Sequence, residues 1–101
     1  MPITGGKYEF IQQNVDLSPN NIGVYELLDS YIEIYIGRAS ETDTIRNRLQ
    51  SHLRGGEGTC TKQATHYRRQ VCSNPVSREI ELLEEYKRIH GGLPRCNQRI
   101  G

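Results

Sequence analysis

Arg48 and His52 are the first side chains in this sequence whose types and spacing could serve chemistry. They lie four residues apart in a segment where apolar residues recur at the spacing of one helix face, at Ile45, Leu49 and Leu53. Residues at i and i+4 are neighbours on a helix, so both polar side chains can reach the same point in space. A guanidinium also offers a planar fork of donors that suits a phosphate. We expect this helix to begin at Thr42 or Asp43 and to end at Gly55-Gly56.

Glu79 lies on the apolar face of a second predicted helix, which begins at Asn74-Pro75, with Asn74 supplying the N-cap oxygen, and runs to about His90. Helical periodicity places it among the apolar residues Val76, Ile80, Leu82, Leu83, Tyr86 and Ile89. An ionised carboxylate is costly to bury unless it is paired or binds a metal. Glu79 therefore needs a partner, which could be an arginine such as Arg69, water at the first helical turn, or a metal ion.

Two triplets in mirror-image order, Gly23-Val24-Tyr25 and Tyr35-Ile36-Gly37, lie on either side of a turn signal at Asp29-Ser30-Tyr31. Strand-forming residues at 24–28 and 32–36 predict a β-hairpin. If the hairpin folds symmetrically about Ser30, the two tyrosines are directly opposed and share one face. Alternation places the isoleucines at 32, 34 and 36 on the buried face, so we expect both phenols on the solvent side.

These triplets resemble the signature of the GIY-YIG nuclease superfamily, with Val24 in place of the usual first isoleucine. Family members carry a catalytic arginine on the first helix, often followed four residues later by a histidine, and Arg48 and His52 match. A single glutamate on the final helix holds the family's metal, which points to Glu79, with Glu84 as the alternative.

An asparagine after the last helix, near a proline, completes the family pattern, and Asn97 matches it. The resemblance covers residues 23–97. Two stretches are a few residues longer than is typical of the family, from Gly37 to Arg48 and from Glu79 to Asn97.

The resemblance implies a divalent-metal-dependent endonuclease that hydrolyses phosphodiester bonds in DNA, with RNA as an alternative substrate. Glu79 would bind one Mg²⁺ or Mn²⁺, and Arg48 would contact the scissile phosphate. Tyr25 would act as general base or position the attacking water, assisted by Tyr35 and His52. The alternative is a catalytically weak module of the same fold that binds nucleic acid or a protein partner. A role in DNA repair or in a mobile element would fit the nuclease.

The predicted fold is α/β (α+β), a small, mostly antiparallel three-stranded sheet flanked by helices. Residues 67–72 form its third strand, and residues 60–65 form a short helical turn before it. The chain of 101 residues fits one domain, residues 23–101. Residues 1–22 are expected to be an N-terminal extension that packs on this domain or leads into it.

The positive charge is concentrated in the middle of the chain, where residues 45–70 hold 6 basic and 1 acidic side chains. A local excess of this kind suits a surface that meets a phosphate backbone. The candidate nucleic-acid contacts are Arg48, Arg54, Lys62, Arg68 and Arg69.

Three cysteines, Cys60, Cys72 and Cys96, show no C-x-x-C spacing and follow no secretory signal, so we expect reduced thiols in a cytoplasmic protein. No apolar stretch is long enough to cross a membrane. We expect a monomer or a weak dimer. One active site cuts one strand, so a double-strand break would require dimerisation or a second encounter.

Overall fold

The computed structural model describes residues 2–97. Its central feature is one antiparallel sheet of four strands in the order β1-β4-β2-β3. The strands are β1 (Tyr8–Glu9), β2 (Gly23–Asp29), β3 (Ile32–Ala39) and β4 (His66–Val71). The helices are α1 (Gln12–Val15), α2 (Ile45–Arg54), α3 (Thr59–Lys62) and α4 (Pro75–His90).

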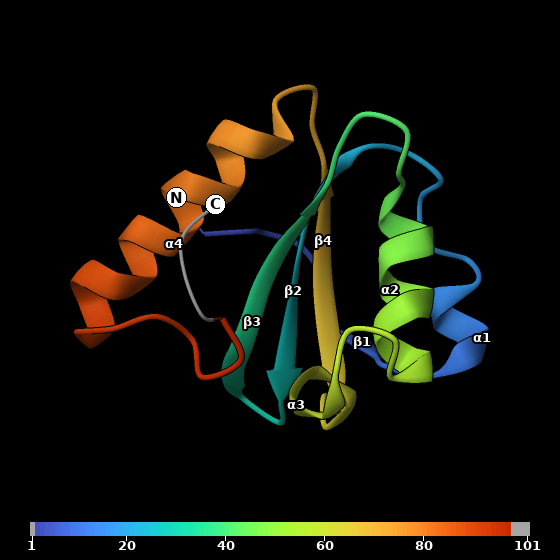
Figure 1. Ribbon diagram of the computed structural model, residues 1–101, viewed down its shortest axis with the longest axis horizontal. Coiled ribbons are helices and arrows are strands. Elements are labelled where there is room, and N and C mark those ends of the chain that lie inside the picture. Colours follow the sequence, from blue (N-terminus) through green and yellow to red (C-terminus); the bar gives the residue numbers. More distant parts are fainter. Residues whose placement is uncertain (1, 98–101) are drawn as a thin grey trace.

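The helices cover the sheet from both sides, with α4 on one side and α1 and α2 on the other (Figure 1). Each side has its own core. The core under α1 and α2 contains Tyr25, Leu27, Ile34, Ile45 and Leu49, and the core under α4 contains Val24, Ile36, Leu82 and Leu83. Because β3 is an edge strand, side chains from both sides of the sheet can meet beyond it.

The expectation of three strands was wrong by one. The additional strand is β1, in which Tyr8 pairs with Tyr67 and Glu9 with His66. With only two residues it is too short to show any alternation in the sequence. Ile3, also within residues 1–22, packs in the core under α4, so this segment forms part of the folded unit.

The predicted helices are present, with two corrections at their N-termini. Helix α2 begins after Thr44, whose hydroxyl accepts a hydrogen bond from the backbone N–H of Asn47, and not after Thr42 or Asp43. It is capped at its C-terminal end by Gly55, in the left-handed conformation that favours glycine. Helix α4 has Pro75 in its first turn as expected, but the Asn74 side chain makes no capping hydrogen bond.

The predicted hairpin forms, but its register differs. Tyr25 lies opposite Gly37, and Leu27 lies opposite Tyr35. The connection is shorter than expected, since Asp29 already pairs with Ile32, and a β-bulge at Ile34 then shifts the pairing by one more residue. Tyr25 and Tyr35 are therefore diagonal neighbours on one face, with ring centroids 6.2 Å apart.

The expectation that both phenols face solvent was also wrong. Tyr25 is 0% exposed, because helices α1 and α2 cover its side of the sheet, and Tyr35 is partly buried. The isoleucines that were expected to share the opposite face separate at the bulge. Ile34 packs with Tyr25, Ile36 packs under α4, and Ile32 is exposed.

The structure contradicts the expectation of reduced thiols at two of the three cysteines. Cys60 and Cys96 form a disulfide across a sequence separation of 36 residues, and Cys72 is free. Such a pair leaves no local spacing signal, since only the fold brings α3 against the segment that follows α4. Within the described residues, no helix is long and apolar enough to span a membrane.

Candidate active site

A polar pocket of about 280 Å³ lies beyond the edge strand β3. It is lined by side chains from β3, from α2 and the loop that precedes it, and from α4, namely Tyr35, Arg38, Ser40, Asp43, Arg48 and Glu79. Three of the residues expected at the site, Tyr35, Arg48 and Glu79, thus come together from three elements. The sheet and the two helices that cover its opposite sides position them.

Glu79 is buried as its helical phase predicted, with 7% of its surface exposed. Its partner is Arg38, whose Nη1 donates to Oε1 at 2.6 Å, and not Arg69. The signal for Arg38 was present in the sequence. It lies two residues after Ile36, which packs under α4, so strand alternation directs Arg38 toward the same side. Glu84 is exposed and lines a shallow surface depression on α4 together with Ser77 and Glu81, so it does not share the pocket.

Behind the pocket, Tyr25, Tyr35 and His52 form a cluster of three rings. The ring centroid of His52 lies 5.5 Å from that of Tyr25 and 5.0 Å from that of Tyr35. The Tyr25 hydroxyl lies 2.8 Å from Nε2 of His52, and Nδ1 of His52 lies 2.9 Å from the hydroxyl of the buried Thr61. Tyr25 and His52 are 0% exposed, so they support the pocket from beneath its surface.

The close packing of the Tyr25 and Tyr35 rings against residue 37 explains why the second triplet ends in glycine. A Cβ atom at this position would stand 2.6 Å from the Tyr25 hydroxyl and 2.6 Å from Cε2 of Tyr35. Any side chain at Gly37 would therefore displace one of the two rings.

Burial controls protonation in this cluster. Burial first, and then the nearby positive charge of Arg48, lower the pKa of His52 from 6.5 to about 4, while the charge of Glu57 opposes them. Burial and the neighbouring Tyr35 raise the pKa of Tyr25, while the Arg48 charge opposes them. Both rings are therefore neutral at pH 7. A neutral imidazole has one donor and one acceptor nitrogen, so one of the two neighbouring hydroxyls donates to His52 and the other accepts from it.

Arg48 is held on its outer side by Glu57, from the loop that follows α2. Its Nη2 donates to Oε1 at 3.0 Å, and its Nη1 donates to Oε2 at 3.2 Å. Nε lies 3.9 Å from Oδ2 of Asp43. Nothing in the pattern of the sequence singles out Glu57, because it lies in a glycine-rich loop without periodicity.

Asn97 lies outside the pocket, at the free edge of β3. Its Oδ1 accepts from the backbone N–H of Ile36 at 2.9 Å, and its Nδ2 donates to the carbonyl of the same residue at 3.0 Å. Next to it, the backbone N–H of Cys96 donates to the carbonyl of Ile34. The segment that follows α4 therefore fixes the middle of the second triplet without contacting the pocket.

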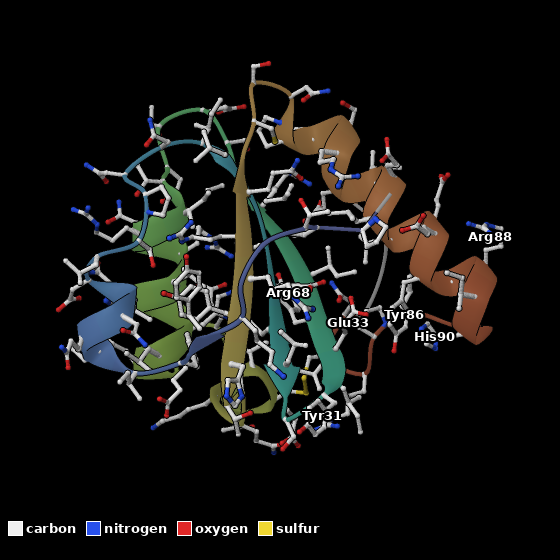
Figure 2. The ribbon with its side chains drawn as sticks, turned by 180° about the vertical axis from the view of Figure 1, so that it is seen from behind. Tyr31, Glu33, Arg68, Tyr86, Arg88 and His90 are labelled. Carbon is white, nitrogen blue, oxygen red and sulfur yellow. A yellow bond between two sulfur atoms is a disulfide. The ribbon has the colours of Figure 1, made fainter. Side chains whose placement is uncertain are left out.

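The candidate nucleic-acid contacts are divided between different surfaces. Arg54 and Lys62 are exposed near the C-terminus of α2. Arg69 lies over the Tyr8 ring, 4.6 Å from its centroid. Arg68 projects to the other side of the sheet, where its Nη1 donates to the buried Glu26 at 2.7 Å. Figure 2 shows Arg68 near Glu33 on that side.

The residues around Glu79 suit a single hard cation. Its Oε2 has no hydrogen-bond partner among the described residues, and the pocket is predominantly polar. A carboxylate oxygen with room for water is the donor set that Mg²⁺ prefers. Residues 2–97 contain no group of three or more histidine, cysteine or acidic side chains that could hold a metal, so the donor set is that of one carboxylate and not of an acidic cluster.

Comparison with known proteins gives similarity at the level of structure. No protein-family model and no curated protein matches the chain. Two solved structures of the N-terminal GIY-YIG endonuclease domain of UvrC from Thermotoga maritima are similar to it, each with a TM-score of 0.67. A point mutant bound to its catalytic divalent cation is 25% identical, over 87% of this chain and 94% of that one. The form bound to magnesium as its catalytic cation is 24% identical, over 86% and 94%.

Proposed function

Because the chain has the GIY-YIG endonuclease fold, we propose that it is a divalent-metal-dependent endonuclease that hydrolyses phosphodiester bonds in DNA. One observation carries the proposal. The Glu79 carboxylate, the Arg48 guanidinium and the Tyr35 hydroxyl come from three elements and line the same polar pocket. Phosphodiester hydrolysis needs a metal ligand, a charge stabiliser and a group that handles the proton of the attacking water. This pocket and the rings behind it offer one of each.

Glu79 is the residue that would hold the metal, through the oxygen that Arg38 does not occupy. When bound, Mg²⁺ or Mn²⁺ supplies Lewis-acid stabilisation of the leaving oxygen. Arg48 contacts the scissile phosphate and stabilises the charge that develops on it, which suits a guanidinium better than an ammonium. Arg38, on the same pocket, offers a second guanidinium for a non-bridging oxygen.

The proton of the attacking water leaves through the ring cluster. Tyr25 is not ionised at pH 7, because burial raises its pKa, so its hydroxyl can accept a proton only if it passes its own to a neighbour. That neighbour is Nε2 of the neutral His52, 2.8 Å away. Tyr35 lines the pocket and orients the water above Tyr25. Thr61 holds the far nitrogen of the imidazole.

DNA contacts outside the pocket come from Arg54 and Lys62, which are exposed near the end of α2. Arg68 is not among them in this proposal, because its guanidinium already neutralises the buried Glu26 on the other side of the sheet. A single pocket cuts one strand, so the proposed product is a nick.

One observation favours a second candidate function, a binding module without catalysis. Arg38 occupies one oxygen of the carboxylate that would hold the metal, at 2.6 Å with Glu79 largely buried. If this ion pair persists in the presence of Mg²⁺, the protein binds nucleic acid or a protein partner through its basic surface and cuts nothing.

Incubation of the purified protein with supercoiled plasmid in Mg²⁺ or Mn²⁺, with and without EDTA, separates these functions. The nuclease converts supercoiled plasmid to open circles only with free metal. Retarded plasmid that stays supercoiled at every metal concentration supports the binding module. Nicking that continues in EDTA contradicts a metal-dependent site. The Glu84→Gln variant tests the alternative ligand, since its loss of nicking beside an active Glu79→Gln variant would move the metal to Glu84.

A further inference from the structure

Arg48, within helix α2, and Glu57, in the loop that follows the helix, form an ion pair with two hydrogen bonds. The two terminal nitrogens of Arg48 each donate to a different oxygen of Glu57, at 3.0 and 3.2 Å. Parallel bonds of this kind fix the plane of a guanidinium as well as its place. The side chains are 26% and 28% exposed, so the pair lies at the surface, and its two-bond geometry is what distinguishes it from an ordinary surface ion pair.

Glu57 is itself held by Ser51, which lies one turn after Arg48 on α2. The Ser51 hydroxyl donates to Oε2 of Glu57 at 2.8 Å, and its carbonyl accepts from the backbone N–H of Gly56 at 2.9 Å. The left-handed conformation of Gly55 reverses the chain so that the loop returns onto the helix. The backbone of the loop and the side chain of Ser51 thus both hold the Glu57 carboxylate next to Arg48.

Without Glu57, the Arg48 side chain would be drawn toward other acidic groups. Asp43 lies 3.9 Å from its Nε, and Glu79 lines the same pocket. An arginine that moved onto Glu79 would compete for the oxygen that a metal needs. The long side chain also has many rotamers to explore when it is not held.

We propose that Glu57 is a positioning residue that holds the Arg48 guanidinium in the orientation needed to meet the scissile phosphate. This role rests on the proposed nuclease function. Glu57 does not line the pocket, and it takes only two of the five N–H donors of Arg48. Its pKa is lowered, first by the Ser51 hydrogen bond and then by Arg48, so the carboxylate stays charged.

Kinetics of plasmid nicking in saturating Mg²⁺ test this role with Glu57→Gln, which keeps the size of the side chain and removes its charge. The matched control is Glu9→Gln, an exposed position on β1 away from the pocket. We expect kcat to fall roughly tenfold or more in Glu57→Gln, with KM within about a factor of two, because a misplaced catalytic group costs rate rather than affinity. An unchanged kcat, or a higher kcat with a lower KM, overturns the proposal, since the second result would make Glu57 a competitor of the phosphate.

NMR of ¹⁵N-arginine-labelled protein tests the same inference without catalysis. A held guanidinium gives separate Nη signals for Arg48, assigned by their absence in Arg48→Lys, and these should merge in Glu57→Gln but not in Glu9→Gln. Signals that stay separate in Glu57→Gln overturn the positioning role whether or not the protein nicks DNA. Failure of the wild-type protein to nick, with the expected NMR change, contradicts the nuclease function alone.

Discussion

The buried hydroxyl of Tyr25 lies 2.8 Å from Nε2 of His52, and both residues are 0% exposed. The pair joins the first triplet to helix α2 directly beneath the pocket. Each ring offers the other a hydrogen bond, and His52 has a second contact with the Thr61 hydroxyl. This contact links the stability of the domain to its proposed chemistry.

Removal of the Tyr25 hydroxyl should reduce both the nicking rate and the stability of the domain, and each effect can be measured on its own. We expect Tyr25→Phe to lose nicking by roughly 100-fold or more, within the range that a general acid–base group supplies. The variant should also lose about 1–3 kcal/mol of unfolding free energy, because Nε2 of His52 is left buried without a partner. Chemical denaturation and nicking rates check the two effects. A variant that nicks at the wild-type rate would remove Tyr25 from the proton path.

His52 should make the metal-free protein less stable in acid. Its pKa is lowered to about 4 in the fold, whereas the unfolded chain takes up the proton near 6.5. The unfolded state therefore binds more protons between these values, and stability is lost as the pH falls from 6.5 toward 4. The loss should total roughly 3 kcal/mol.

The wild-type protein and His52→Gln should be compared by denaturation between pH 4 and pH 8. Glu26, whose pKa burial raises to about 7, acts in the opposite direction, since its contribution is lost as the pH rises from 4.5 to 7. Subtracting the unfolding free energy of His52→Gln from that of the wild type at each pH cancels the Glu26 contribution, because both proteins contain Glu26. We expect the stability advantage of the wild type to shrink toward pH 4. An advantage that is constant with pH would show that His52 is not held neutral.

Gly37→Ala tests the close approach of the two tyrosines to β3. The added methyl would lie 2.6 Å from the Tyr25 hydroxyl, so the ring must move. We expect a loss of about 1–3 kcal/mol of unfolding free energy from overpacking, together with slower nicking. Gly92→Ala is the control, because a Cβ there meets no atom within 4 Å. Equal stability of the two variants would contradict the packing described around Gly37.

The disulfide between Cys60 and Cys96 should contribute strongly to stability. Closing a loop of this length in the unfolded chain is worth about 4 kcal/mol. Cys96→Ser should therefore lower the unfolding free energy by an amount of this order, and dithiothreitol should do the same to the wild type. Cys72→Ser is the control, since that thiol is free. A melting temperature that does not respond to dithiothreitol would argue against the bond in solution.

The sequence predicted those parts of the fold and site that depend on regular periodicity. Ile45, Leu49 and Leu53 define the buried side of α2, and helical phase alone placed Glu79 on the buried side of α4. The Arg48 and Glu79 side chains reach one pocket because each helix presents the predicted face. Val76 and Ile89 show the limit of this reasoning, since they lie near the two ends of α4 and are exposed although helical phase placed them on the apolar face.

What the sequence could not predict depends on irregular or distant contacts. The two-residue turn and the bulge at Ile34 have no signature in the residue pattern, yet together they moved Tyr25 from opposite Tyr35 to opposite Gly37. The Cys60–Cys96 bond and the Asn97 contact with Ile36 join segments that only the finished fold brings together. Glu57 belongs to the same group, because a loop of glycines carries no period.

The central claim is that Glu79 holds the metal of a nuclease, and the nicking rate of supercoiled plasmid by wild type and Glu79→Gln in Mg²⁺ tests it most directly. Glu79→Gln preserves the size of the side chain, so circular dichroism and melting should confirm that the variant is folded. We predict metal-dependent nicking by the wild type and a loss of roughly 1,000-fold or more in the variant, since the metal contributes several kcal/mol to the transition state. Nicking by the folded variant at the wild-type rate would contradict the account.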